Sequence, residues 1–115
     1  MIAILTALLL TIATQAEADC DKLCDRDWWK TATAADVQAE LDAGADVTAR
    51  DQYGSTPLHE AAGNGSAKGI QALLDAGADP KVKDGLNKEP WLYAQFNKRL
   101  KYVEDYWPLL IRSIN

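Results

Sequence analysis

Residues 51–83 read DQYGSTPLHEAAGNGSAKGIQALLDAGADPKVK, and this stretch decides the fold. Thr56 can cap a helix with its hydroxyl group, and Pro57 suits the first helical position because its missing N–H is not needed there. Apolar residues then recur at helical spacing through a second segment that ends near Leu74. Gly77 lies where a residue of left-handed conformation often ends a helix. The stretch therefore predicts two short helices joined by a turn and followed by a loop.

The same pattern recurs on both sides of this stretch. The hexapeptide LDAGAD occurs at residues 41–46 and again at residues 74–79, 33 positions later. The same offset relates Pro57 to Pro90. One regular unit is therefore flanked by two degenerate ones. Because a repeat unit cannot bury its own faces, the three units are expected to stack.

Together these landmarks resemble an ankyrin repeat, a unit of about 33 residues with two antiparallel helices and a return loop. The resemblance rests mainly on Thr56-Pro57-Leu58-His59. It implies an all-α fold, a short ankyrin-repeat solenoid of about three helix-turn-helix repeats whose outer two are degenerate caps. It also gives His59 a structural role, with its imidazole bonded to a neighbouring backbone. Residues 19–115 would form this domain, with repeat 1 at about 21–50, repeat 2 at 51–83 and repeat 3 at 84–115.

The outer repeats are rich in tryptophan. End repeats meet solvent on one side, so we expect large rings to close the two ends of the stack, namely Trp28, Trp29, Trp91 and Trp107. In repeat 1, either Asp25 or Asp27 is expected to cap the first helix, and Thr33 with Asp36 resembles a capping box.

Repeat 3 is the least regular. Its first helix is expected to run from Pro90 to about Asn97. Pro108 predicts a break near residue 107, because proline disfavours helical dihedrals in the residue before it. A short terminal helix over residues 109–113 would then fold back over the last face of the stack.

The first 18 residues predict a cleaved secretory signal peptide. Residues 2–13 form an apolar run that is too short for a membrane-spanning helix of about 20 residues. An A-x-A cleavage site follows at residues 16–18, and cleavage after Ala16 is the alternative. No basic residue precedes the run, which leaves a retained anchor or a misplaced start codon open. The expected location is the periplasm or outside the cell, with no stable membrane span after cleavage.

Cys20 and Cys24 are the chain's two cysteines. In an exported protein an even count favours a disulfide, and helical spacing would bring Cα atoms four residues apart within bridging range. Because the closed loop is short, the bond would mainly staple the terminus. A redox or metal role and free thiols remain open. A lipid anchor on Cys20 fits poorly with the preceding Ala18-Asp19.

Little in the sequence points to catalysis or to nucleic acid. The formal net charge is −5, with an acidic N-terminal third and a weakly basic C-terminal third. This asymmetry is either solvated surface or a steering field, and the basic residues are too few for a nucleic-acid interface. His59 is the only histidine, so neither a triad nor a metal site is predicted. No cofactor is expected.

The resemblance implies a non-catalytic protein-protein interaction module that binds a protein partner through its turn tips and inner helix face. The positions left free by the fold are Gln52, Tyr53, Ser55, Glu60, Gly63 and Asn64 in repeat 2, and Gly85, Leu86, Lys88, Tyr93, Phe96 and Asn97 in repeat 3. Tyr53, Tyr93 and Phe96 are the expected anchors, because aromatic side chains contribute much binding energy per residue. A small interface is expected, on a monomer or a weakly self-associating protein. The alternative, by resemblance to exported bacterial ankyrin proteins, is an envelope oxidative-stress or redox accessory factor that uses Cys20 and Cys24.

Overall fold

The computed structural model describes residues 20–114, and within this range every regular element is helical. The predicted signal peptide lies outside these residues. A 3₁₀ helix and six α-helices follow in order: η1 (Lys22–Cys24), α2 (Arg26–Thr31), α3 (Ala34–Asp42), α4 (Pro57–Asn64), α5 (Ala67–Asp75), α6 (Pro90–Ala94) and α7 (Val103–Ile114).

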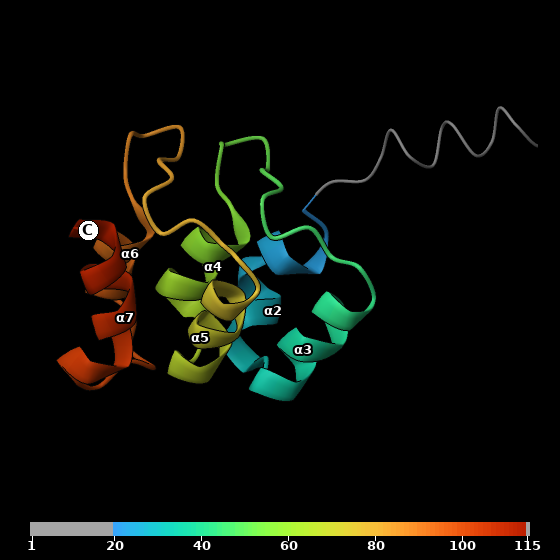
Figure 1. The fold of residues 1–115 in the computed structure, drawn as a ribbon, viewed down its shortest axis with the longest axis horizontal. Helices are drawn as coiled ribbons and strands as arrows, with labels where there is room; N and C mark the ends of the chain where they lie inside the picture. Colours follow the sequence, from blue (N-terminus) through green and yellow to red (C-terminus); the bar gives the residue numbers. More distant parts are fainter. Residues whose placement is uncertain (1–19, 115) are drawn as a thin grey trace, which may run out of the picture.

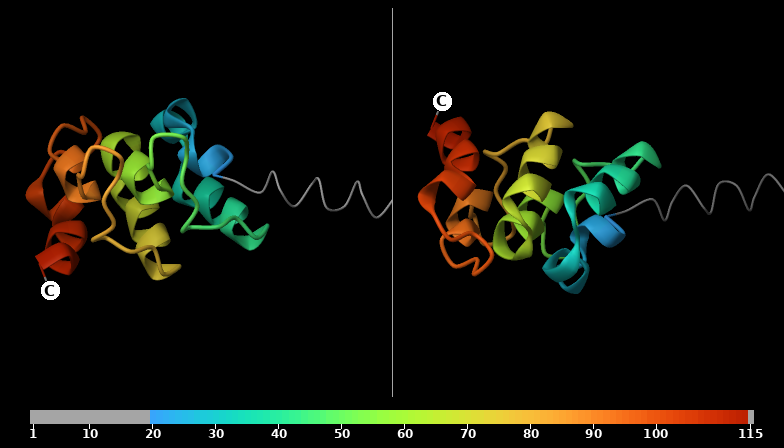
Figure 2. Two further views of the ribbon diagram at one scale, coloured as in Figure 1. Left: turned by 90° about the horizontal axis from the view of Figure 1, so that it is seen from above. Right: turned by 90° about the horizontal axis from the view of Figure 1, so that it is seen from below.

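The six α-helices form three hairpins stacked side by side (Figure 1). Helix α4 lies between α2 and α6 in one layer, and α5 lies between α3 and α7 in the other. The two views in Figure 2 show the same order along the stack. Two long loops project from one edge of the stack, one between α3 and α4 and the other between α5 and α6. The predicted all-α solenoid of three helical hairpins is confirmed.

Side-chain caps fix where the helices begin. The Asp25 carboxylate accepts hydrogen bonds from the first turn of α2, so Asp25 and not Asp27 is the cap. Thr33 and Asp36 form the predicted capping box at the start of α3. The Ser66 hydroxyl accepts a hydrogen bond from the Gly69 N–H at the start of α5. Each cap satisfies N–H groups that have no partner within the helix.

Trp29 is the largest side chain in the core and is fully buried. Its indole N–H donates a 2.7 Å hydrogen bond to the Leu23 carbonyl. The ring lies between the first and second hairpins, where Gly65 and Gly69 leave room for it. Trp29 is therefore an internal packing residue and not a lid over the end of the stack.

The other three tryptophans differ in their exposure. Trp28 and Trp91 are partly buried and pack against the core, as a closing role requires. Trp107 is 49% exposed, so the prediction that its ring closes the far end is wrong. The fully buried side chain of α7 is Leu109 instead.

Repeat 3 departs from the sequence-based expectation at two points. Helix α6 ends at Ala94, three residues before the predicted Asn97. The predicted break at Pro108 is also wrong, because α7 continues through it. Tyr106 and Leu109, on either side of the proline, both pack against the core. Their burial outweighs the one helical hydrogen bond that proline removes.

Cys20 and Cys24 form a disulfide around η1, with Cα atoms 5.1 Å apart. The Cys20 sulfur lies 3.5 Å from the Ala49 carbonyl oxygen, and the Cys24 sulfur lies 3.7 Å from the Ser55 carbonyl oxygen. Since a disulfide has no S–H to donate, these are packing contacts in the oxidised form. They place the start of the described chain against the loop between α3 and α4.

Gly65 and Gly63 offer a matched pair of substitutions. An alanine Cβ at Gly65 would lie 2.8 Å from both Trp29 Cε3 and the Ala61 carbonyl oxygen. We expect Gly65→Ala to lower the free energy of unfolding by about 1–3 kcal/mol through overpacking. At Gly63, within α4, a Cβ would meet only Tyr93 Cβ at 3.6 Å. Gly63→Ala is therefore expected to stabilise by about 0.5–1 kcal/mol. Urea unfolding of both variants checks this, and a neutral Gly65→Ala would contradict the packing of Trp29.

Candidate functional site

A groove of about 810 Å³ runs between the tips of the two projecting loops and the layer of α2, α4 and α6. We call it the finger groove. It is lined by Arg26, Asp51, Gln52, Tyr53, Gly54, Ser55, His59, Glu60, Gly63, Asn64, Asp84, Gly85, Leu86, Tyr93 and Phe96. Two successive repeats and the start of α2 contribute to it, so no single repeat forms the site.

Each loop tip is built around one aspartate. Asp51 Oδ1 accepts hydrogen bonds from the N–H groups of Tyr53 and Ser55, and Asp84 Oδ1 does the same for Leu86 and Lys88. The two aspartates are 33 residues apart, and the two loop tips therefore have the same turn structure. It holds Gly54 and its counterpart Asn87 at positive φ, 75° and 63°.

The two loop tips are tied directly to each other. The Gly85 N–H donates a 2.9 Å hydrogen bond to the Tyr53 carbonyl. The Arg50 guanidinium donates to the carbonyls of Gly54 and Lys83, on neighbouring loops. These bonds fix the spacing of the upper wall of the groove.

His59 connects the second repeat to the third beneath the loops. Its Nδ1 accepts a 3.2 Å hydrogen bond from the Thr56 N–H, and its Nε2 lies 2.8 Å from the Lys88 carbonyl oxygen. Because a carbonyl only accepts, Nε2 must carry the proton and Nδ1 must be unprotonated. The residue as a whole is 3% exposed. The inter-repeat role implied by the resemblance matches this geometry.

The pKa of His59 is lowered from its usual 6.5 by burial, although the bond to Lys88 and the nearby Asp84 act in the opposite direction. The unfolded chain takes up a proton near pH 6.5 while the folded chain does so only at lower pH. The stability that neutral His59 contributes above pH 6.5 is therefore lost as the pH falls through the pKa of His59 in the folded protein. Burial raises the pKa of Glu60 above its usual 4.5. The stability that Glu60 contributes is therefore present at low pH and is lost as the pH rises through its folded-state pKa.

We expect an NMR titration of the single imidazole to show this shift directly. The folded protein should give a His59 pKa below 6.5, and the urea-unfolded chain should give the ordinary value. A folded-state pKa at or above 6.5 would contradict the buried, singly protonated ring.

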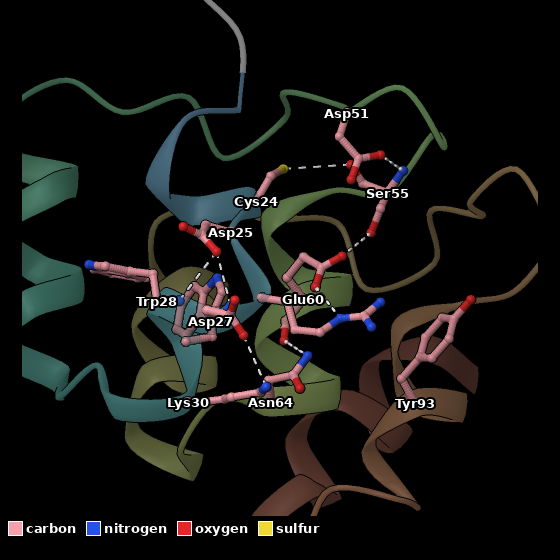
Figure 3. Close-up of polar contacts among 12 residues, drawn as sticks. Cys24, Asp25, Asp27, Trp28, Lys30, Asp51, Ser55, Glu60, Asn64 and Tyr93 are labelled. Atoms are coloured by element: carbon pink, nitrogen blue, oxygen red, sulfur yellow. Dashed lines mark hydrogen bonds and ion pairs between the residues drawn. The ribbon is translucent and has the colours of Figure 1, made fainter.

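Glu60 lies on α4 (Figure 3) and is one of the residues that line the groove. Its side chain is 13% exposed. Oε1 accepts a 3.2 Å hydrogen bond from the Ser55 hydroxyl, while Oε2 lies 4.0 Å from Arg26 Nε, at the outer limit of an ion pair. The Arg26 side chain is 71% exposed, so this cation is only loosely held.

Tyr93 stands on α6 next to α4 in the same view (Figure 3). Its hydroxyl donates a short hydrogen bond to Asp84 Oδ2. Burial, together with this bond, raises the pKa of Tyr93 to about 12. Burial would also raise the pKa of Asp84, but hydrogen bonds from Tyr93 and from two backbone N–H groups outweigh it and lower that pKa. Tyr93 is thus fixed in place as one wall of the groove.

Most of the residues expected to bind a partner gather in the finger groove. Tyr53, Leu86 and Phe96 are exposed by 71%, 71% and 83%. Lys88 does not line the groove, although its ammonium lies 6.0 Å from the centre of the Tyr93 ring. Gln52, Ser55, Glu60, Gly63, Asn64, Gly85 and Tyr93 complete the set in the groove.

Asn97 was expected on the binding face and is instead structural. Its amide is buried and donates to the carbonyls of Ala62 and Gly65 in the preceding hairpin. The neighbouring Arg99 donates to the Trp29 carbonyl, 70 residues away in the sequence. Both side chains therefore hold the third hairpin to the earlier ones.

The sequence did not predict five residues of the groove lining, namely Arg26, Asp51, Gly54, His59 and Asp84. Arg26 and His59 are 33 positions apart, so the repeat offset already relates these two groove residues to each other. Within the described range, no group of three or more His, Cys, Asp or Glu residues is placed to hold a metal ion. No helix there is long and apolar enough to span a membrane.

Stacked helical hairpins with loops projecting from one edge define a short helical-repeat solenoid. Residues 39–89 match the family model described as ankyrin repeats (many copies). The match supports membership of the ankyrin-repeat family. Proteins of this family are generally non-catalytic, and ankyrin repeats suggest a protein-protein interaction module. A search of curated proteins found no match.

Proposed function

We propose that this protein binds a protein partner in the finger groove, with Tyr53, Tyr93 and Phe96 as anchors. The observation that carries the proposal is the pair of highly exposed aromatic side chains, Tyr53 and Phe96, at a preformed groove. Exposed apolar side chains around a concave site are typical of interaction surfaces. Aromatic anchors often supply much of the binding energy at such sites.

The rigidity of the groove supports the same function. The loop tips are bonded to each other, His59 bonds one repeat to the next, and Tyr93 is fixed by Asp84. A preorganised site loses little conformational entropy when its partner binds. With three hairpins the available surface is small, so a compact interface of moderate affinity is expected.

Cross-linking in cells that express the full chain tests the proposal. Tyr53→Ala/Phe96→Ala removes two exposed groove anchors, and Tyr102→Ala/Trp107→Ala removes two exposed aromatic residues outside the groove. A partner recovered with the wild type and with the second variant, and lost with the first, is the expected result. Equal recovery with both double variants would contradict the site.

The same proposal places the protein in the periplasm or outside the cell, where the Cys20–Cys24 disulfide would persist. We assign that disulfide a stapling role and not a redox one, since its sulfurs pack against the loop that carries the groove. Replacing both cysteines with serine should leave partner recovery intact. Loss of recovery in a folded variant would favour the redox alternative.

A further inference from the structure

The charge of the finger groove is unbalanced. Its lining holds the carboxylates of Asp51, Glu60 and Asp84 against the single guanidinium of Arg26. His59 does not offset this imbalance, because burial lowers its pKa and keeps it neutral near pH 7. A bound segment therefore meets more negative than positive charge among the residues that line the groove.

The three carboxylates are not equally available to a ligand. Oδ1 of Asp51 and Oδ1 of Asp84 are occupied by the loop-tip N–H groups, and Asp84 Oδ2 accepts from Tyr93. Glu60 is different, because Oε2 has only Arg26 at 4.0 Å. Within the described residues Asp51 Oδ2 also accepts no hydrogen bond, but Asp51 shapes the loop tip through Oδ1, whereas Glu60 belongs to α4 and can exchange one cation for another at Oε2.

Because Glu60 is largely buried, a cation from a partner would stabilise its carboxylate strongly. The Glu60 side chain is only 13% exposed, and desolvation raises its pKa. A partly desolvated carboxylate gains more from a close cation than a solvated one does. Arg26, with its side chain 71% exposed, can swing into solvent as a partner's cation arrives.

The apolar rim defines the rest of the ligand. Tyr53 and Leu86, at the loop tips, and Phe96, beyond the end of α6, are exposed around the same groove. A segment that places a cation against Glu60 would lay its neighbouring side chains against this rim. The combination selects against acidic segments and against purely polar basic ones.

We infer that the finger groove recognises a segment of a partner protein that presents an arginine or lysine side chain to Glu60, flanked by apolar residues against Tyr53, Leu86 and Phe96. The inference rests on the proposed function and deepens it by stating the partner's chemistry. The basic group displaces Arg26 from Oε2, while Oε1 keeps its hydrogen bond from Ser55.

Selection from a random 12-residue peptide phage library on the full chain tests this. Clones that also bind Tyr53→Ala/Phe96→Ala are discarded, so that only groove-dependent peptides remain. We expect these peptides to share an arginine or lysine with apolar residues on either side. Groove-dependent peptides without a basic residue would overturn this inference and leave the proposed function standing. A library that gives no groove-dependent peptide would count against both.

Fluorescence anisotropy with the tightest selected peptide then measures the role of Glu60. Glu60→Gln keeps an oxygen for Ser55 but loses the charge, and binding should weaken by about tenfold or more. Arg26→Gln removes the competing cation, and binding should strengthen by about two- to fivefold. Glu104→Gln, at an exposed acid on α7 that does not line the groove, should change it less than twofold. Unchanged binding by Glu60→Gln, or weaker binding by Arg26→Gln, would overturn the inference.

Discussion

Replacing Trp29 with alanine is expected to lower the free energy of unfolding by about 3–5 kcal/mol. The side chain is fully buried, and its ring fills the space left by Gly65 and Gly69 between the first two hairpins. Alanine would leave a cavity there and would also remove the donor to the Leu23 carbonyl. Small domains have about 5–15 kcal/mol of stability in total, so this variant should be largely unfolded or marginal.

Urea unfolding followed by circular dichroism measures this effect, and Trp107→Ala is the matched control. The Trp107 ring is 49% exposed, so its loss should cost less than about 1 kcal/mol. A Trp29→Ala protein as stable as Trp107→Ala would show that the first hairpin does not pack as described.

His59→Ala is expected to have the second-largest effect, a loss of about 2–4 kcal/mol. The substitution leaves the Thr56 N–H and the Lys88 carbonyl without their partner, and each unsatisfied buried group costs about 1–3 kcal/mol. The bond to Lys88 spans two repeats, so its loss should also weaken the cooperativity of unfolding.

Lys88→Ala is the control for this prediction, because only the Lys88 backbone carbonyl accepts from His59. Its side chain makes a distant contact with the Tyr93 ring, and removing it should cost less than about 1 kcal/mol. Equal losses from the two variants would mean that the imidazole bridge contributes little.

The regular parts of the fold could be predicted because each rests on a local signal. Pro57 and Gly77 mark the start and the end of the second hairpin, and Thr33 with Asp36 marks the start of α3. The 33-residue offset then placed the other hairpins. The same offset also predicted that most groove residues lie near one another, because equivalent positions of stacked repeats lie side by side.

What could not be predicted depends on contacts between distant residues. Gly65 ends α4, and its lack of a side chain also makes room for Trp29, which comes from a helix far away in the sequence. Pro108 was expected to break a helix, but packing of the residues on either side overrides that local preference. Asn97 was assigned to the surface by its position in the repeat, and its bonds to the preceding hairpin bury it.

The central claim is that partners bind in the finger groove. The most direct test is the map of backbone amide NMR shifts when the tightest selected peptide is added to the full chain. The account predicts that the largest shifts fall on the loop tips around residues 51–55 and 84–88, and on the groove side of α4 and α6. Shifts concentrated on α3, α5 and α7 instead would place the binding surface on the opposite layer and contradict the account.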